Sequence, residues 1–362
     1  MIEARADLYI KASHVAFLWP LFSHPLLTTA SHLSLPLQSP ILASNISSIL
    51  LPQAAMTKAI LVTLATGKQG SSVIDNLLQQ APDADIEILA VTRSTTSTSA
   101  QKLANKSPKI KLVQGNPDHP DQIFENAKKV TSNPIWGVYA VLLASFTGHS
   151  DIEEKQGHGL IDAALKNNVK HFVYSSVDRG GESSINNPTT VPHFISKHKN
   201  EHHLINASKG TDMAWTILRP AAFLDGGLVT GFAGKAWATV WKVAMREVPL
   251  QVIAVSDIGF FAAQAFLKPE EYKGKAVSLA GDQLSFAEMA GVFKSSTGQT
   301  VPTTFEFIAH FAMWMVRDMG TMFTWFREEG SKADIQALKK VHPGLKDFRA
   351  WLESESDWRK AA

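Results

Sequence analysis

The chain has 362 residues, of which 45% are hydrophobic and 19% charged, so a sizeable core can form and disorder over most of the length is excluded. Lys and Arg total 35 against 33 Asp and Glu, and this net charge of +2 excludes the broad basic face of a protein that binds DNA or RNA directly. Because there is no Cys, a disulfide scaffold and a Cys nucleophile are excluded, and a reducing compartment such as the cytoplasm is favoured. No apolar run reaches the roughly 18 residues that span a bilayer, so we expect no membrane partner.

Residues 1–55 differ in composition from the rest of the chain. They are rich in Ser, Leu, Pro and His, and their only charged residues are Glu3, Arg5, Asp7 and Lys11. No helical or strand period lasts long enough to form an element. We therefore expect an extension outside the fold: a disordered segment, a targeting peptide of the mitochondrial type, or the product of a misplaced start codon ahead of Met56.

From residue 56 the chain alternates between apolar runs of strand length and segments with helical spacing. The expected strands are 59–65, 86–92, 110–114, 137–144, 171–175 and 215–218, and the expected helices are 71–80, 121–130, 152–168 and 192–208. Strands that alternate with helices of this length indicate parallel pairing. The pattern predicts an α/β fold, with a Rossmann-type doubly wound parallel sheet over 56–220 and ligands beyond the carboxyl ends of its strands.

Residues 221–362 are expected to form a smaller, mainly helical C-terminal lobe that serves a substrate or a partner. Within it we expect a strand at 250–255, either in the lobe or returning to the sheet, a helix at 259–267 and a short strand at 276–279. Aromatic and Met side chains recur between 305 and 326. They either line a flat apolar pocket or form the core of the lobe.

The loop after the first expected strand carries the strongest signal for a ligand. It reads T-L-A-T-G-K-Q-G over 63–70, and Gly67 and Gly70 match the last two glycines of a dinucleotide fingerprint. Leu64 replaces the first glycine, and we expect its side chain to press on the turn or on the cofactor. A P-loop is excluded because Gln69 stands where its Ser or Thr should be. The alternative is a glycine-rich helix start without a ligand, although helix N-terminal N–H groups favour an anion in either case.

Arg93 decides between the two nicotinamide cofactors. An NAD site places Asp or Glu near the end of the second strand, where it bonds the ribose 2′-hydroxyl. Here the strand ends in Thr92-Arg93-Ser94, and a guanidinium suits a 2′-phosphate. The sequence therefore favours NADP(H) over NAD(H); the alternative is that Arg93 is a solvated residue at a strand end.

Taken together, these segments resemble the NmrA-like family of atypical short-chain dehydrogenases, in its fungal branch. The family pattern T-G-A-T-G-x-Q-G is similar to the loop at 63–70, and further similar segments are 115–116, 170–181, 192–201, 219–220, 257–259 and 279–282. The resemblance covers residues 56–358 and implies an NADP(H)-binding Rossmann domain. It implies cofactor contacts from Thr66, Gly67, Gln69, Gly70, Arg93, Asn116 and Lys197.

The helix after the fifth expected strand carries the candidate catalytic residues. Ordinary short-chain dehydrogenases use Tyr-x-x-x-Lys here, in which the Tyr transfers a proton and the Lys holds the nicotinamide ribose. This chain has His193-x-x-x-Lys197, so Lys197 can hold the ribose and His193 can act as the acid–base group. The alternative is that Lys197 and Glu201 form an exposed i,i+4 ion pair. His198 and His202 are spaced as zinc ligands can be, but no third ligand stands at a matching position and we expect no metal site.

Two functions fit these residues, and a third follows if Leu64 blocks the dinucleotide. The resemblance implies an NADP(H)-binding regulator that senses redox state through a protein partner such as a transcription factor, in the cytoplasm and also in the nucleus. The alternative is an NADPH-dependent oxidoreductase that acts on a small aromatic or secondary metabolite. In the third case the chain is a partner-binding module without a cofactor. The missing Tyr favours the regulator, and the aromatic second half of the chain leaves the reductase open.

Overall fold

The computed structural model describes residues 57–143, 150–228 and 230–358. The extension expected over 1–55 lies outside these residues. Among the helices of the described ranges, none is both long enough and apolar enough to cross a membrane.

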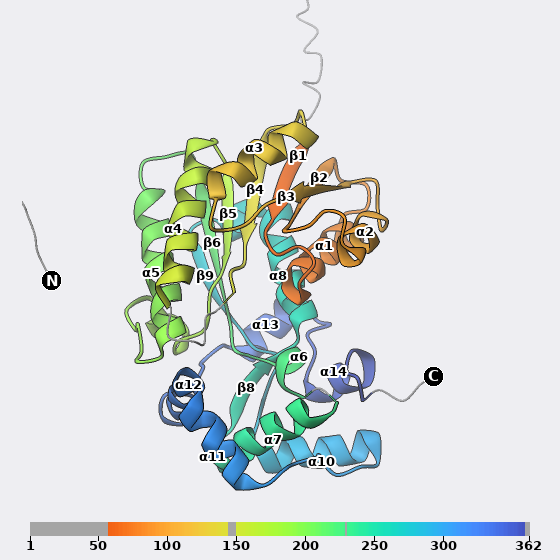
Figure 1. Cartoon of the computed structure of the whole chain (residues 1–362), viewed down its shortest axis with the longest axis vertical. Coiled ribbons are helices and arrows are strands. Elements are labelled where there is room, and N and C mark those ends of the chain that lie inside the picture. Colours follow the sequence, from red (N-terminus) through yellow and green to blue (C-terminus); the bar gives the residue numbers. More distant parts are fainter. Residues whose placement is uncertain (1–56, 144–149, 229, 359–362) are drawn as a thin grey trace, which may run out of the picture. The chain divides into compact units, whose positions relative to one another are not determined.

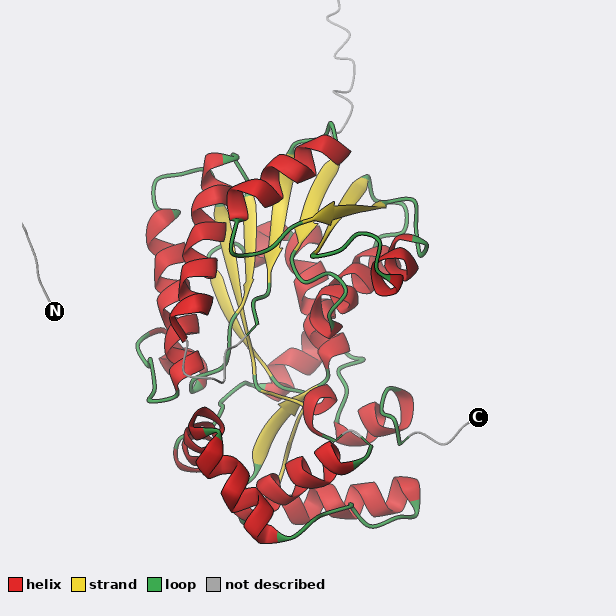
Figure 2. Cartoon of the chain, viewed as in Figure 1, coloured by secondary structure: helices red, strands yellow, loops and turns green. Residues whose placement is uncertain are grey.

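A seven-stranded parallel sheet lies at the centre of the larger part of the protein (Figures 1 and 2). Its strands follow the order β3-β2-β1-β4-β5-β6-β9, and the direction of this order reverses between β1 and β4 as in a doubly wound sheet. Helices cover both faces, so the strands are apolar runs, and β5 is buried at every position. The strands are β1 (Lys58–Val62), β2 (Ile86–Thr92), β3 (Ile110–Gln114), β4 (Ile135–Ala140), β5 (His171–Ser175), β6 (Ala214–Pro220) and β9 (Lys275–Leu279). The predicted Rossmann-type fold is confirmed.

The two faces of this sheet carry separate hydrophobic cores. The first core includes side chains from α3 (Pro120–Val130), α4 (Ser150–Lys166) and α5 (Pro192–Ala207). The second includes side chains from α1 (Lys68–Gln80), α2 (Thr98–Ala104), α8 (Val255–Leu267) and α13 (Ile335–Val341). The short helices η1 (Gly181–Ile185) and α9 (Pro269–Tyr272) follow β5 and α8. Helices α1 and α8 touch closely, because a Cβ atom on Gly259 would lie 2.1 Å from Ser72 Oγ.

The remaining elements form a smaller part, called here the C-terminal lobe (Figure 1). It contains a second sheet in the order β10-β8-β7 and six helices of the described chain. The elements are β7 (Ala222–Phe223), α6 (Leu224–Gly227), α7 (Phe232–Met245), β8 (Leu250–Ile253), β10 (Asp282–Leu284), α10 (Phe286–Thr297), α11 (Glu306–Met315), α12 (Arg317–Glu328) and α14 (Phe348–Ser354). Trp241, Phe293 and Phe323 belong to the core of the lobe, and Phe194 of α5 packs into the same core. The lobe is therefore anchored on α5.

The structure settles one alternative that the sequence left open and corrects two expectations. The strand expected within the lobe at 276–279 is β9 of the large sheet. The strand expected at 250–255 does not return to the large sheet, because β8 pairs with β7 and β10, while β9 occupies the place beside β6. The polar stretch after β2, in which the sequence indicates no element, contains α2. The sequence does not reveal α2 because the helix is short and buries only Ala100 and Leu103.

Glu201 of α5 is fully buried between two guanidinium groups. Its Oε2 atom accepts hydrogen bonds from Nη2 of Arg179, at 2.8 Å, and from Nη2 of Arg219, at 2.6 Å. Ser176 also donates to this carboxylate. Burial by itself raises the pKa of Glu201, but the two arginines hold that pKa below its ordinary value. Because Arg179 follows β5 and Arg219 lies on β6, the cluster fixes α5 against the sheet.

We expect Glu201→Ala to lower the free energy of unfolding by about 3–5 kcal/mol, because two buried guanidinium groups lose their counter-charge. Urea denaturation measures this change, with Asp212→Asn as the control. That variant breaks an exposed ion pair, in which Nζ of Lys170 lies 3.0 Å from Oδ2 of Asp212. It should lower the free energy of unfolding by at most about 1 kcal/mol. Equal losses in the two variants would contradict the assignment.

The same carboxylate should make stability depend on pH. A lowered pKa in the folded state means that the contribution of Glu201 is fully present above the ordinary value of 4.5 and is lost as the pH falls through the lowered value. The difference in unfolding free energy between wild type and Glu201→Gln should therefore shrink on acidification below that range. A difference that stays constant would show that the carboxylate charge is not responsible.

Candidate functional site

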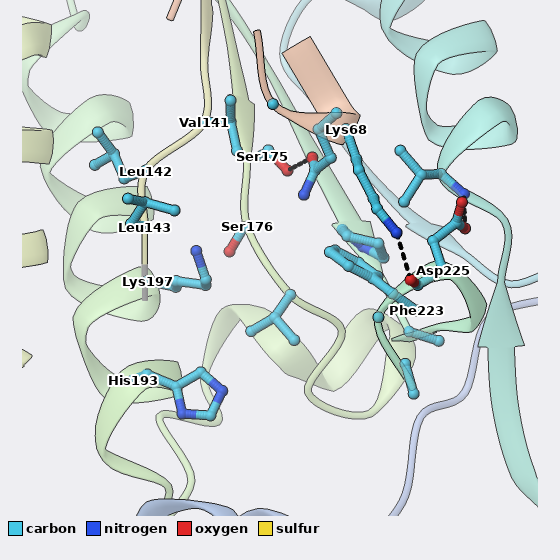
Figure 3. A pocket seen from close by; sticks show the side chains of 18 of the residues that line it. Lys68, Val141, Leu142, Leu143, Ser175, Ser176, His193, Lys197, Phe223 and Asp225 are labelled. Carbon is cyan, nitrogen blue, oxygen red and sulfur yellow. Dashed lines mark hydrogen bonds between the residues drawn. The ribbon is translucent and has the colours of Figure 1, made fainter. Parts of the chain in front are cut away.

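A cavity of about 710 Å³ lies at the carboxyl ends of β1, β4 and β5 (Figure 3). The glycine loop at 63–70 forms one wall, α5 forms another, and the chain after β6 together with α12 forms a third. Most of the polar side chains come from the loop, the end of β5 and α5, and Asp225 of α6 adds a carboxylate from the lobe. Those used below are Lys68, Gln69, Ser175, His193 and Lys197. The side chains from the lobe are mainly apolar and include Phe223, Trp237, Met319, Met322 and Phe326. The cavity thus joins a polar end and an apolar end at the edge of the sheet where doubly wound folds bind ligands.

The glycine loop makes the turn of a dinucleotide site with a leucine in the first glycine position. Thr63 fixes its start, because its Oγ1 donates to the carbonyl of Val141 at 2.8 Å and accepts from the N–H of the same residue at 2.9 Å. Leu64 then adopts a φ of 46°, in the left-handed region where a side chain costs about 1–2 kcal/mol. Its side chain is half-buried, packs against the core and lines the cavity. The replacement of the first glycine therefore introduces backbone strain at this turn.

The remaining glycines keep the loop close to α1 and leave room for an anion. A Cβ atom on Gly70 would lie 2.4 Å from the carbonyl oxygen of Leu64, and one on Gly67 would lie 3.2 Å from the same atom. Helix α1 begins at Lys68, and the N–H groups of a first turn have no acceptors within their own helix. A pyrophosphate suits such a helix start, so these residues fit the phosphates of a dinucleotide.

Two hydroxyl groups orient Gln69. Its Oε1 accepts from Tyr139 of β4 at 3.0 Å and from Ser175 of β5 at 2.7 Å. Burial raises the pKa of Tyr139, so this phenol stays protonated and acts as a donor. With both hydroxyls on the carbonyl oxygen, the amide nitrogen of Gln69 serves as a hydrogen-bond donor at the cavity wall.

Lys197 and His193 lie on α5 along one side of the cavity (Figure 3). The ammonium group of Lys197 donates to Oε1 of Glu153 on α4 at 2.6 Å, and both side chains are largely buried. The sequence left open that Lys197 and Glu201 form an exposed ion pair. This alternative is wrong, because Glu201 is paired with Arg179 and Arg219 inside the fold. An ammonium has three donors, so Lys197 can bond Glu153 and a ligand together.

His193 is joined to the C-terminal lobe by a buried hydrogen bond. Its Nδ1 lies 2.5 Å from Oδ1 of Asp318, in the first turn of α12. The side chains are 6% and 4% exposed, so water does not screen the contact. The pair connects α5, which carries Lys197, to the helix that supplies Met319 and Met322 to the cavity wall.

Three of the predicted cofactor residues lie outside the cavity wall. Thr66 is exposed in the glycine loop, Arg93 is exposed directly after β2, and Asn116 is exposed shortly after β3. The amide of Gly115 bonds the carbonyl of Thr92 at 2.9 Å, which holds the chain after β3 beside the end of β2. These three residues therefore lie at the same carboxyl edge of the sheet as the cavity, but they do not line the cavity.

Sequence reasoning missed the acidic partners of both catalytic candidates. Glu153 lies in the first turn of α4, where an acid is ordinary, and nothing in the sequence links it to Lys197. Asp318 could have been identified from the sequence, because it is the only acidic residue between 307 and 326, a segment rich in aromatic and Met residues. A single carboxylate in such a segment is expected to have a buried partner.

We expect Leu64→Gly to bind NADP(H) several-fold more tightly than wild type, because it removes the side chain from the phosphate loop and the strain of a left-handed leucine. Isothermal titration measures the dissociation constant. Leu64→Ala is the matched control, since it removes most of the bulk but keeps the Cβ strain. Weaker binding by Leu64→Gly would contradict the interpretation that Leu64 hinders the dinucleotide.

Comparison with known proteins agrees with this geometry. Residues 56–352 match the model of the NmrA-like family. The NmrA-like family domain-containing oxidoreductase ptmS of Penicillium ochrochloron is 25% identical, over 82% of this chain and 98% of that protein. Triphenylmethane reductase of Citrobacter sp., solved with NADP(H), has a TM-score of 0.60 and 16% identity over 81% of this chain and 98% of its own. NmrA, a negative transcriptional regulator solved with NADP, has a TM-score of 0.58 and 15% identity over 83% of this chain and 95% of its own.

These two solved structures, each of which contains a bound nicotinamide dinucleotide, share the fold of this chain. Because the family model covers the described sheet, the cavity and nearly all of the lobe, the chain belongs to the NmrA-like family.

Proposed function

We propose that the protein binds NADP(H) and uses it to reduce a small, uncharged aromatic molecule. The observation that carries this proposal is the cavity of about 710 Å³, which joins the glycine loop to apolar side chains of the lobe. A protein that only sensed the dinucleotide would need no second, apolar compartment beside it. The relatives named as oxidoreductases support the same choice.

In this proposal the dinucleotide lies across the carboxyl edge of the large sheet. The first-turn N–H groups of α1 hold the pyrophosphate, and the exposed guanidinium of Arg93 holds the 2′-phosphate. Asn116 borders the adenine. Lys197 binds the nicotinamide ribose with the ammonium donors that Glu153 leaves available.

The apolar end of the cavity would receive the substrate. The reduced nicotinamide supplies two electrons and one hydrogen, so the protein has to supply one proton. His193 would hold that proton at Nε2 as an imidazolium whose Nδ1–H donates to Asp318. Phe223, Met319 and Phe326 exclude water and select against charged molecules.

A different observation favours a second function, a redox-sensing regulator that acts through a protein partner such as a transcription factor. Helix α11 exposes apolar side chains at helical spacing: Phe307, Phe311, Trp314 and Met315 are 68%, 53%, 73% and 60% exposed. Large exposed apolar patches often mark protein interfaces. A regulator of this kind would act in the cytoplasm and the nucleus, and it would bind NADP(H) without consuming it.

We expect Arg93→Ala to weaken NADPH binding about tenfold or more and to change NADH binding little, since one charge-assisted hydrogen bond to a phosphate contributes about 1.5–3 kcal/mol. Titration of both dinucleotides measures the difference. Lys128→Ala, an exposed basic residue in the last turn of α3, is the control for loss of charge alone. Equal losses for NADPH and NADH would contradict the role of Arg93.

We expect the purified protein to oxidise NADPH in the presence of uncharged quinones or aromatic carbonyl compounds, followed by the absorbance of the reduced nicotinamide. Met319→Lys, which places a charge in the cavity wall, should raise KM for the substrate at least tenfold and leave NADPH binding unchanged. Thr324→Lys, on the exposed side of the same helix, should change neither. Tight NADPH binding without turnover on any such substrate would favour the regulator instead.

A further inference from the structure

We propose that Asp318 is a positioning residue that fixes His193 as the proton donor of the cavity, so that the donor is assembled only when the C-terminal lobe packs on α5. This inference rests on the proposed reductase function. The two residues are 125 positions apart, and they meet through Nδ1 of His193 and Oδ1 of Asp318 at 2.5 Å. The hydrogen bond therefore depends on the packing of the lobe and is not a local feature of either helix.

The burial of the pair gives the contact its chemical consequence. Within the described residues the second carboxylate oxygen of Asp318, Oδ2, is buried and has no hydrogen-bond partner. Because one oxygen of this buried carboxylate lacks a hydrogen bond, its other oxygen requires a hydrogen-bond donor, and a cationic donor is the more favourable. The imidazole of His193 meets this need when Nδ1 carries a proton.

Two helix starts meet at this pair. Asp318 is the second residue of α12 and His193 is the second residue of α5, so the carboxylate of Asp318 lies near the positive ends of two helix dipoles. Both dipoles favour a negative charge here, and the packing of the two helices places Asp318 at that point.

The location of the pair connects it with the substrate. His193 lines the cavity, and Val316, Met319 and Met322 line it from both sides of Asp318 in the sequence. The helix that shapes the apolar wall thus also sets the orientation of the imidazole. If the lobe moved away from α5, the cavity would lose its apolar wall and His193 would lose the contact that orients it.

The proton step replaces the one that tyrosine performs in ordinary short-chain dehydrogenases. With Nδ1–H held by Asp318, an imidazolium at His193 gives the proton on Nε2 to the carbonyl oxygen of the substrate and is left as the neutral Nδ1–H tautomer. A bound reduced dinucleotide would supply the hydride that the carbonyl carbon needs to become an alcohol. A proton from solvent then restores Nε2–H, and Asp318 itself exchanges no proton.

Asp318→Asn is the test variant, because it keeps the shape of the side chain and removes the charge. In a catalytic triad the same replacement leaves the geometry intact and gives the histidine the wrong tautomer. Nitrogen-15 NMR of the imidazole, assigned with His193→Gln, gives a readout in the cofactor-free protein. We expect a proton on Nδ1 of neutral His193 in wild type and on Nε2 in Asp318→Asn; the same tautomer in both proteins would overturn the positioning role.

Kinetics provide the second readout. We expect Asp318→Asn to lower kcat by about 10²–10⁴-fold, the usual range for general acid catalysis, with the NADPH dissociation constant within twofold of wild type. Asp318→Asn in the His193→Gln background should cause no further loss, since a residue that acts through His193 has no effect without it. Additive losses, or an unchanged kcat in Asp318→Asn, would overturn the proposal.

A second His–Asp pair supplies the matched control. Nε2 of His342 lies 3.1 Å from Oδ1 of the buried Asp257, and neither residue lines the cavity. His342→Gln should lower stability and leave kcat unchanged. If the wild-type protein shows no turnover, the proposed function fails and the proton-donor role falls with it, whereas the tautomer measurement still decides the positioning of His193 by Asp318.

Discussion

A buried carboxylate between two guanidinium groups holds the arrangement on which the cavity depends. Glu201 binds Arg179 and Arg219 and thereby fixes α5 to the loop after β5 and to β6. Residues four apart share a helix face, so the rotation of α5 that places Glu201 inside the fold also turns Lys197 and His193 along the same side. A structural ion cluster therefore determines where Lys197 and His193 lie, although Glu201, Arg179 and Arg219 do not line the cavity themselves.

The glycine loop accepts a strained residue within this rigid frame. Leu64 keeps a left-handed backbone because Thr63 ties the loop to β4 and because Gly70 lets α1 approach. Its half-buried side chain packs on the core, which offsets part of the strain. The departure from the glycine pattern thus changes the lining of the cavity at the glycine loop and leaves the turn intact.

The sequence was sufficient for features that arise from local patterns. The first six strands of the large sheet, the helix start at the glycine loop and the placement of His193 and Lys197 one turn apart all follow from residues near one another in the chain, whereas β9 was expected in the lobe. The partners of these residues do not: Lys197 meets Glu153 across 44 positions, and His193 meets Asp318 across 125. Periodicity also could not tell which sheet receives the strand at 250–253, because a short apolar run is compatible with either.

The central claim is that one cavity holds the nicotinamide end of NADP(H) beside an apolar substrate compartment. A crystal structure of the protein with NADPH tests it most directly. The account predicts density for the pyrophosphate at the start of α1, for the 2′-phosphate at Arg93 and for the nicotinamide ribose at Lys197, with the apolar end of the cavity left open. A dinucleotide bound elsewhere, or a nicotinamide that fills the space between Phe223 and Met319, would contradict it.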